Sequence, residues 1–251
     1  MATASSTKIH TRLFVENTLA GTNSIDLDKD QSHYLANVMR VKVGDKIALF
    51  NGRDGEWACE VTALGKRHVT LDVGERTKDQ STEPDLWLAF APIKKARLDF
   101  IAQKATELGV SHMVPVLTRR TIVDRVKTER MTANAVEAAE QCERMNVPTV
   151  GDPVKLNKLL DDWPSERKIM FCDEDLSGKA AHTALKEVDN KPASEPWAIL
   201  IGPEGGFDGA ERDLIRNHPN CLTVSLGPRI LRADTAAMAA ISLWQSALGD
   251  W

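Results

Sequence analysis

Two short segments near the carboxyl end carry the residues best suited to holding a ligand. Residues 202–207 read Gly-Pro-Glu-Gly-Gly-Phe, and residues 226–236 read Leu-Gly-Pro-Arg-Ile-Leu-Arg-Ala-Asp-Thr-Ala. Glycine lets the main chain approach a ligand closely and adopt positive φ, because no side chain is in the way. Each segment follows an apolar run, residues 197–201 and 222–226, that predicts a buried strand. Since open α/β sheets bind ligands at the carboxyl ends of their strands, we predict an active site where these turns lie side by side.

The charged residues of the two turns narrow the class of ligand. Glu204 would repel a phosphate held by the first turn, so a cationic or neutral ligand fits better. No Gly-Lys-Ser/Thr follows, as a P-loop requires, and Pro203 and Glu204 interrupt the Gly-x-Gly-x-x-Gly dinucleotide pattern. Arg229 and Arg232 would be costly to bury at a strand-to-helix junction, which indicates a function. The plainer alternatives are a tight connection for the first turn and surface salt bridges, with Asp234 as one partner, for the arginines.

Strands and helices alternate around these turns. We predict further strands at residues 86–91, 112–117 and 168–172, and helices ending before Gly109, at 128–145, at 180–188, after Phe207 and at 234–248. Gly109 suits the position after a helix, and Asp208 with Glu211 suits a capping box. The alternation predicts a mostly parallel sheet covered on both faces. The last helix is apolar around much of its circumference, so it is buried in its own domain or also packs on a second subunit.

The amino-terminal part has a different pattern. Short strands are predicted at residues 13–15, 46–50, 56–63 and 68–73, with one helix at 31–39, which together favour a small barrel. Residues 74–84 lack apolar periodicity and are interpreted as a linker. We therefore place a domain boundary near residue 78, giving domains 1–78 and 79–251.

Composition limits the class of protein. The chain has 251 residues, 42% of them hydrophobic, and a formal net charge of −4, which argues against a general polyanion binder. Its four cysteines form no Cys-x-x-Cys pair, so we expect reduced thiols and no metal site. The first eight residues lack the apolar core of a signal peptide, and no apolar run is long enough to span a bilayer. A soluble, cytoplasmic protein without membrane partners is expected.

Five motifs in order resemble one family, the bacterial 16S rRNA (uracil-N3)-methyltransferases of the RsmE type, which belong to the knotted SPOUT superfamily. Two are the turns described above. The others are His-Tyr-Leu-Ala-Asn-Val-Met-Arg at residues 33–40 with Gly44-Asp45, Lys-Ala-Thr-Glu-Leu-Gly-Val at 104–110 with Pro115, and Glu-Gln-Cys-Glu-Arg at 140–144 with Pro148. The departures are small: Ala233-Asp234 stands in place of Thr-Glu, Met39 in place of Leu, and Arg-Thr-Ile at 120–122 in place of Arg-Ser-Val.

The resemblance implies a fold and a cofactor. It implies a PUA-like, RNA-binding β-barrel over residues 1–78 and a SPOUT α/β domain with a deep trefoil knot over 79–251. The cofactor would be S-adenosylmethionine, read largely by main-chain groups. The implied cofactor-binding residues are Leu200, Gly202, Pro203, Glu204, Gly205, Gly206, Leu226, Gly227, Arg229, Ile230 and Leu231. It also implies a homodimer with the cofactor beside the interface.

The implied reaction places a methyl group on uracil N3. That nitrogen normally holds a proton, so a fixed cation is needed to favour its anion. Arg232 is the candidate for this charge, and the proton could leave to Asp234, to Glu140 or to solvent. Arg144, in the motif of Glu140, completes the catalytic candidates. Asp234 is a methylene shorter than the residue usual there, which weakens a positioning role.

RNA contact requires cations, and they concentrate in one segment. Residues 92–130 hold nine lysines and arginines against four acids, despite the acidic whole. Phosphate contacts supply most of the salt-dependent affinity; the alternative is a solvated face. The predicted RNA-binding residues are Arg12, His33, Arg40, Lys94, Lys95, Arg97, Lys104, Arg119 and Arg120. The partner would be 16S rRNA within the small ribosomal subunit.

Two other functions compete with this interpretation. A knotted methyltransferase acting on ribose 2′-oxygen or on tRNA would share the cofactor turns. A non-catalytic RNA-binding protein would keep the barrel and the basic segment, but it predicts damaged turns, whereas both turns here are intact.

Overall fold

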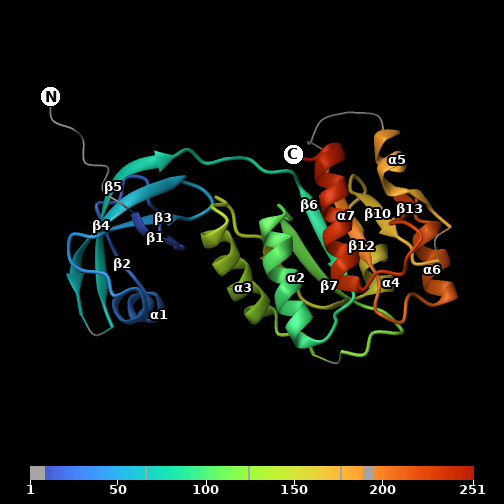
Figure 1. Cartoon of the computed structure of the whole chain (residues 1–251), viewed down its shortest axis with the longest axis horizontal. Helices are drawn as coiled ribbons and strands as arrows, with labels where there is room; N and C mark the ends of the chain where they lie inside the picture. Colours follow the sequence, from blue (N-terminus) through green and yellow to red (C-terminus); the bar gives the residue numbers. More distant parts are fainter. Residues whose placement is uncertain (1–8, 66, 124, 176, 189–194) are drawn as a thin grey trace. The chain divides into compact units, whose positions relative to one another are not determined.

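The computed structural model divides into two compact units (Figure 1). It describes residues 9–65, 67–123, 125–175, 177–188 and 195–251, without the side chain of Lys95. Unit 1 comprises Met1–Thr82 and Glu140–Asn146, and unit 2 comprises Glu83–Ala139 and Val147–Trp251.

Unit 1 is built on a five-stranded sheet in the order β1-β3-β4-β5-β2. β1 and β3 are parallel and the other pairs are antiparallel. One face buries a small apolar core that includes Leu13, Leu35 and Val61. The strands are β1 (Ile9–Phe14), β2 (Ser24–Asp26), β3 (Lys46–Phe50), β4 (Glu56–Leu64) and β5 (Val69–Lys78).

The predicted helix at 31–39 is two short elements. Helix α1 (Lys29–His33) starts at Asp28, whose side chain accepts hydrogen bonds from two main-chain N–H groups, and the π-helix η1 (Tyr34–Met39) ends at Arg40 with φ 55°. The predicted linker at 74–84 begins too early, because β5 continues to Lys78. Residues 74–78 are polar and mostly exposed, so this end of the strand gives no apolar alternation.

Residues 140–146 leave the second unit and pack with the first. The Phe14 N–H donates to Glu140 Oε1 (2.9 Å), Arg12 Nη2 donates to the Arg144 carbonyl (2.8 Å), and Lys78 Nζ donates to Glu143 Oε2 (2.7 Å). The helix predicted at 128–145 is therefore too long: α3 (Thr128–Gln141) ends earlier and Glu143 has φ 63°. The sequence pattern favours a longer helix, but these tertiary hydrogen bonds stabilise a non-helical conformation after Gln141.

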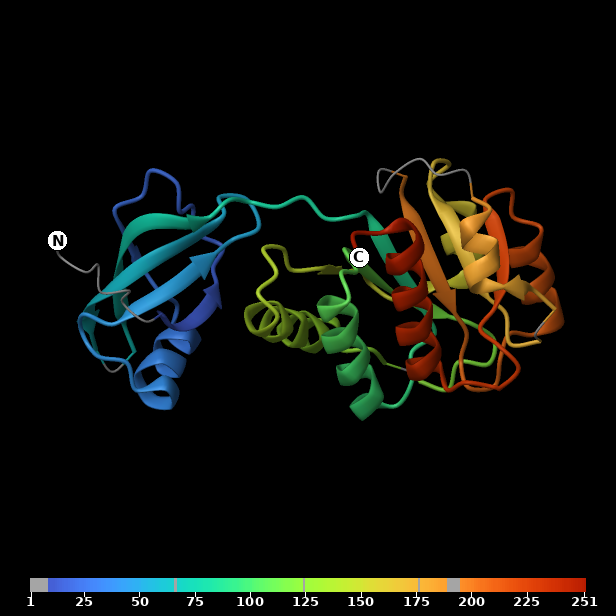
Figure 2. The ribbon, with the colours of Figure 1, turned by 45° about the horizontal axis from the view of Figure 1, so that its top comes forward.

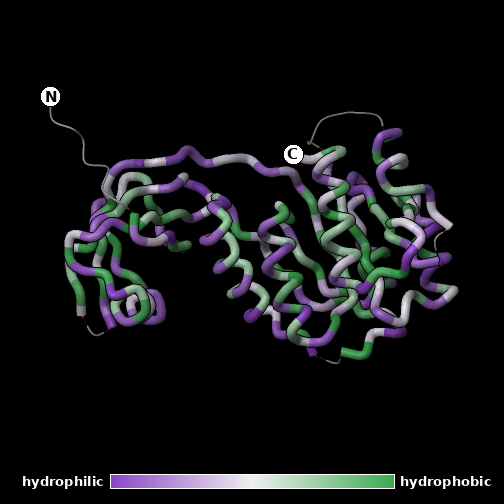
Figure 3. The backbone as a smooth tube through the Cα atoms, in the orientation of Figure 1, coloured by the Kyte–Doolittle hydropathy of each residue, from purple (hydrophilic) through white to green (hydrophobic). Residues whose placement is uncertain are grey.

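Unit 2 is built on an eight-stranded sheet in which every described pair is parallel. The order is β11-β13-β10-β12-β6-β7-β8, and β9 also pairs with β7. The strands are β6 (Leu86–Phe90), β7 (His112–Leu117), β8 (Thr149–Val150), β9 (Val154–Lys155), β10 (Lys168–Cys172), β11 (Lys179–Ala180), β12 (Trp197–Ile201) and β13 (Cys221–Ser225). Apolar residues run along these strands (Figure 3).

Helices cover both faces of this sheet, as predicted. One core joins it to α2 (Lys95–Glu107), α3, α5 (Ala181–Lys186) and α7 (Ala233–Leu248). The other joins it to α4 (Leu156–Asp161) and α6 (Gly209–Arg216). Helices α2 and α7 lie side by side (Figure 2). Among the described residues, no helix combines the length and apolar character that crossing a bilayer demands.

The helix-end residues predicted in this unit are confirmed. Gly109 follows α2 with φ 86°, and Asp208 and Glu211 form both hydrogen bonds of a capping box at the start of α6. Strands β8, β9 and β11 and helix α4 were missed, because two- and six-residue elements carry too little periodicity.

The turns after β12 and β13 do not lie on adjacent strands. β10 lies between them and pairs with both. Crossover connections set the order of parallel strands, and the order along the chain does not reveal it. The end of β10 is therefore a third contributor to the site, which the sequence interpretation lacked.

Candidate active site

The turn after β12, residues 202–207, is held in one conformation by packing. A Cβ at Gly202 would lie 2.7 Å from the Phe207 ring, and one at Gly206, where φ is 68°, would lie 2.3 Å from Glu174 Oε1. Phe207 is buried and meets Phe171 of β10 edge to face, with ring centroids 5.4 Å apart. A side chain at Gly202 would thus clash with the Phe207 ring, and one at Gly206 would require both a strained backbone and a shift of Glu174.

Side chains from two other segments also hold this turn. Glu174, just after β10, accepts hydrogen bonds from the Phe207 N–H (2.9 Å) and from Arg212. Arg120, after β7, donates from Nη1 to the Gly205 carbonyl (2.7 Å). We call Glu174 and Arg120 the braces of the first turn.

Glu174 belongs to an ion-pair network at the end of β10. The Asp173 side chain is fully buried and accepts from Arg212 Nε (3.1 Å) and Arg216 Nε (2.9 Å). Arg216 also pairs with Asp175. Hydrogen bonds from Ser177, together with the Arg216 guanidinium, lower the pKa of Asp175 to about 2.

The turn after β13, residues 226–232, has far fewer contacts. Gly227 has φ 108° with open space where a Cβ would lie, and its N–H meets Ser225 Oγ at 3.3 Å. Ile230 is 85% exposed. Arg229 and Arg232 are exposed too, and neither has an ion-pair partner within the part of the chain that the structure describes. Both arginines thus lie in solvent, and the described residues include no partner for the surface salt bridges that were the plainer alternative.

A cavity of about 50 Å³ lies between this second turn and the end of β10. Its apolar wall includes Leu226, Ile230 and Leu231, and its polar wall includes Asp173 and Glu174. The sequence interpretation missed the β10 residues, although Asp-Glu-Asp directly after a predicted buried strand was a usable signal. Cys172 also lines the cavity; burial raises the pKa of its thiol, so it stays protonated at neutral pH.

One cation links the two turns. Arg97, in the first turn of α2, lies with Nη1 3.9 Å from Glu204 Oε1 and with Nε 3.7 Å from Asp234 Oδ2. Glu204 belongs to the turn after β12, and Asp234 lies in the first turn of α7, just beyond the turn after β13. Asp234 thus pairs with Arg97, and not with its neighbouring arginines.

Comparison with known proteins gives one family. The chain matches a family model described as RNA methyltransferase domain at residues 80–245 and one described as RNA methyltransferase PUA domain at 27–74. It is 32% identical to the ribosomal RNA small subunit methyltransferase E of Rickettsia conorii (93% of this chain, 94% of that protein) and 33% identical to that of Bacillus subtilis (85% and 86%).

The chain belongs to the ribosomal RNA small subunit methyltransferase E family. A crystal structure of such a methyltransferase from Neisseria gonorrhoeae bound to S-adenosylmethionine is similar, with TM-score 0.85, 29% identity and coverage of 96% of this chain and 99% of that one. A methyltransferase from Legionella pneumophila in complex with the same cofactor gives TM-score 0.86 and 27% identity over 97% and 100%. The expected PUA-like amino-terminal domain and SPOUT-type methyltransferase fold are confirmed.

The residues that the family resemblance named for the cofactor divide into two groups. Leu226, Gly227, Arg229, Ile230 and Leu231 all line the cavity. Leu200, on β12, is buried in the core between the sheet and helices α4 and α6. The first-turn residues 202–206 do not line the cavity. Glu174 connects the groups, since it lines the cavity and holds the first turn.

The catalytic candidates that the family resemblance named fall into two pairs, one in each unit. Arg232 and Asp234 lie together at the start of α7, beside the second turn. Glu140 and Arg144 belong to unit 1, where the Glu140 carboxylate and the Arg144 carbonyl accept the hydrogen bonds described above.

The predicted RNA-binding residues differ in their exposure and in their ion-pair partners. Arg12 is almost buried, over the Phe50 ring and paired with Glu56. Lys104 pairs with Glu107, Arg119 with Asp208, and Arg97 and Arg120 are held at the turns. His33, Arg40 and Lys94 are exposed, and the side chain of Lys95 lies outside the described structure.

Proposed function

We propose that this protein transfers the methyl group of S-adenosylmethionine to N3 of a uridine in 16S ribosomal RNA of the small subunit. The observation that carries the proposal is the cavity between β10 and the glycine turn after β13. It lies at the carboxyl edge of a parallel sheet, in a chain whose relatives are named for small-subunit rRNA methylation and have similar structures bound to this cofactor.

The residues of the cavity fit the two ends of S-adenosylmethionine. Apolar side chains suit an adenine, and the partly exposed Glu174 carboxylate suits a molecule that carries a sulfonium and an ammonium. Ile230 and Leu231 make no main-chain hydrogen bond to another described residue, so their N–H groups are free to donate to a base. The volume of about 50 Å³ is far below the roughly 300–1,000 Å³ of whole-ligand sites. This cavity can therefore hold the whole cofactor only if the second turn moves.

When bound, the cofactor supplies an electrophilic methyl group. The role of this chain is to favour the uracil anion and to fix its position. Arg232, exposed beside the second turn, is the candidate for lowering the pKa of N3, by roughly one to three pH units when an opposite charge is close. An arginine cannot accept the proton at neutral pH. Asp234, Glu140 and solvent remain the candidate acceptors.

Positioning is the second contribution. The braced first turn and the Arg97 bridge hold Glu204 and Asp234 at fixed places, which orients whatever binds between them. Alignment of nitrogen, methyl carbon and sulfur in one line supplies much of the rate in such transfers. The target base lies in folded RNA and has to leave its stack to reach the site.

The proposal extends to assembly. We expect a homodimer, a small-subunit particle as substrate, a trefoil knot at the turns and a cytoplasmic location. Partly exposed apolar residues of α7, among them Met238 and Leu243, support the dimer, because a monomer would leave them in water.

Mass spectrometry of digested rRNA tests the function. Small-subunit rRNA from a strain that lacks the protein should lose one 3-methyluridine, and the purified protein with S-adenosylmethionine should restore it. An unchanged 3-methyluridine level together with a missing 2′-O-methyl nucleoside, or a mark missing from tRNA, would reject the proposal. A protein that binds RNA without any transfer would point to the non-catalytic alternative.

A further inference from the structure

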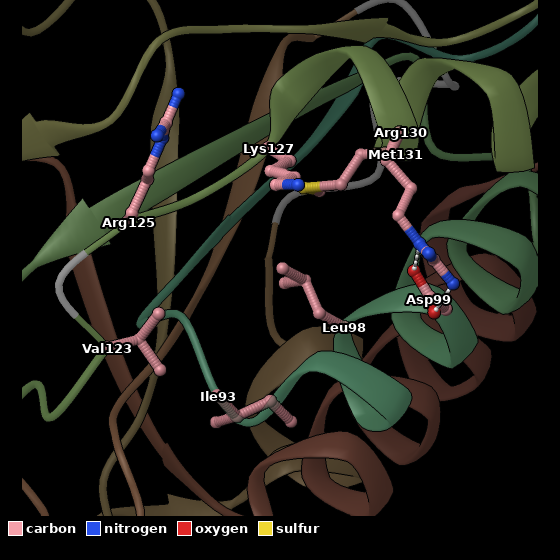
Figure 4. Close-up of a pocket in the computed structure, with 8 residues that line it drawn as sticks. All are labelled: Ile93, Leu98, Asp99, Val123, Arg125, Lys127, Arg130 and Met131. Carbon is pink, nitrogen blue, oxygen red and sulfur yellow. Dashed lines mark hydrogen bonds and ion pairs between the residues drawn. The ribbon is translucent and has the colours of Figure 1, made fainter.

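A second cavity of unit 2, of about 220 Å³, lies apart from the cofactor turns (Figure 4). It is lined by the start of α2, the start of α3 and three residues of the connection between β7 and α3, namely Val123, Arg125 and Lys127. Its floor is apolar: Ile93, Leu98 and Met131 are buried and belong to the core of the unit. Val123 closes one side with a half-buried side chain.

The rim of this cavity is cationic. Arg125 and Lys127 are exposed, and neither has a carboxylate partner among the described residues. Asp99 is the one carboxylate among the described lining residues, and Arg130 neutralises it with two hydrogen bonds, Nε to Oδ1 (2.7 Å) and Nη2 to Oδ2 (2.5 Å). Figure 4 shows this ion pair at one side and Arg125 at the other. Among the described lining residues, the rim therefore presents positive charge above an apolar floor, with the paired Asp99 as its one carboxylate.

The same chain segments connect this cavity to the first cofactor turn. Arg120 holds the Gly205 carbonyl, and Val123 follows three residues later, which spans at most roughly 11 Å. On α2, Arg97 faces Glu204 and Asp234, while the next residue, Leu98, lines the cavity. A strand of RNA with one base at the turns could thus reach the cavity with a base close by.

We infer that this cavity binds a second nucleotide of the RNA substrate, close to the methylated uridine. The inference rests on the proposed function. The base would lie on Leu98, Met131 and Val123, and its phosphate would pair with Arg125 and Lys127. No base-reading amide faces the cavity among its described lining residues, so apolar burial and phosphate charge set the affinity, and base identity matters little.

This occupant matches the chemistry of the cavity better than the alternatives. A free anion would gain nothing from the apolar floor, and the cofactor, which is cationic, would meet the charge of the rim. A flipped base with its phosphate uses both parts of the site. Single-stranded RNA is bound by this combination of a basic edge and a surface for the base.

Two variants test the inference by removing the two parts separately. Arg125→Ala with Lys127→Ala removes the phosphate contacts, and Val123→Phe fills the space of the base. Lys158→Ala is the matched control, because Lys158 is an exposed cation of the same unit on α4, which packs on the other face of the sheet. Thermal unfolding and the KM for S-adenosylmethionine report whether each variant keeps its fold and its cofactor site.

We expect each cavity variant to raise the KM for RNA by about ten- to a hundredfold, with kcat changed by less than about threefold. The double variant should also reduce the slope of log affinity against log salt by about 0.7, because one phosphate loses its cationic partners and each neutralised phosphate accounts for about 0.7 on single strands. Lys158→Ala should change neither quantity. Unchanged RNA KM and salt slope in well-folded variants would overturn the inference.

Binding of a short uridine-containing RNA, followed by fluorescence anisotropy without any methyl transfer, separates this inference from the proposed function. If the wild-type protein makes no 3-methyluridine but the cavity variants still bind this RNA about tenfold more weakly, the function fails and the cavity assignment holds. If methylation is normal and all variants bind equally, the cavity assignment alone fails. A changed molar mass of Val123→Phe in solution with unaffected RNA binding would assign the cavity to contact with a second copy and overturn the inference.

Discussion

The two glycine turns at the carboxyl edge of the sheet differ sharply in how they are held. The first turn, residues 202–207, is fixed by Glu174, Arg120 and the packing of Phe207. In the second, residues 226–232, Leu226 packs on the core and Gly227 has two long hydrogen bonds with Ser225, while the Ile230 side chain lies almost wholly in solvent. One half of the site is thus formed in advance, and the other half is free to adapt.

This difference assigns separate tasks to the turns. A fixed turn lowers the cost of ordering the site when a ligand binds. A loosely held turn belongs to the low-stability parts of a fold, which are the parts able to close over a ligand. The cavity of about 50 Å³ lies against the second turn, where movement can enlarge it.

Replacing Arg232 should have the largest effect on activity. Arg232→Ala is expected to lower kcat by roughly 10²–10³, the usual loss when a group that stabilises developing charge is removed. Cofactor affinity should stay within a few-fold, because Arg232 is outside the cavity lining. Steady-state methyl transfer and calorimetry with S-adenosylmethionine measure the two quantities. An active Arg232→Ala enzyme would remove this residue from the mechanism and leave the second turn with a binding role only.

Alanine at Gly206 and at Gly227 compares the turns directly. Both glycines have positive φ, so each substitution strains the backbone by about 1–3 kcal/mol. Gly206→Ala should cost more free energy of unfolding than Gly227→Ala, since its Cβ would clash with Glu174 and displace a brace, whereas the space at Gly227 is open. Denaturant unfolding and cofactor calorimetry measure both effects. Equal losses would mean that the first turn is not held as tightly as its contacts imply.

Removing the brace itself should have an intermediate effect. Glu174→Ala leaves the Phe207 N–H and Arg212 Nη2 without their acceptor, although Arg212 Nε keeps Asp173; this costs about 1–3 kcal/mol of unfolding free energy and raises the KM for S-adenosylmethionine. Glu174→Gln keeps an oxygen for the Phe207 N–H and should recover much of the loss. If Gln and Ala behave alike, the charge on Glu174 matters more than its hydrogen bond to the turn.

The sequence was informative where local chemistry decides the structure. The Asp208–Glu211 capping box, the left-handed Gly109 and most strands of the parallel sheet were predicted within a few residues. The family motifs located both turns, whose glycines have little room for a side chain, as at Gly202, or a positive φ, as at Gly206 and Gly227. Exposure of Arg229 and Arg232 was not predictable, since it depends on which way the turn projects.

Contacts between residues far apart in the sequence could not be predicted either. The position of β10 between β12 and β13 follows from crossover connections, so the acidic residues after β10 were visible in the sequence but could not be placed between the two turns. The predicted helix ran on to residue 145, but residues 140–146 belong to unit 1, where they form hydrogen bonds with β1 and β5. In both cases, contacts between distant residues decide the outcome, and periodicity reports only near neighbours.

The smallest expected effect concerns acid stability of the network beneath the first turn. Asp175 has a pKa of about 2 in the folded protein, below its ordinary value of 3.8, so its ionised form stabilises the fold. This contribution is complete above about pH 4 and is lost as the pH falls toward 2. Because Asp175 is partly exposed, it should amount to less than about 1 kcal/mol.

Asp175→Asn should therefore lower the unfolding free energy slightly at pH 7 and narrow its difference from wild type as the pH falls from 4 to 2. Urea unfolding at several pH values measures this difference. Asp162→Asn is the control, since that carboxylate lies 3.4 Å from the exposed Lys158 on α4, away from the turns. A constant difference across the pH range would show that Asp175 acts through the shape of its side chain. If the difference narrows and cofactor binding also weakens at low pH, the protonation state of the ion-pair network around Asp173 and Asp175 affects the first turn.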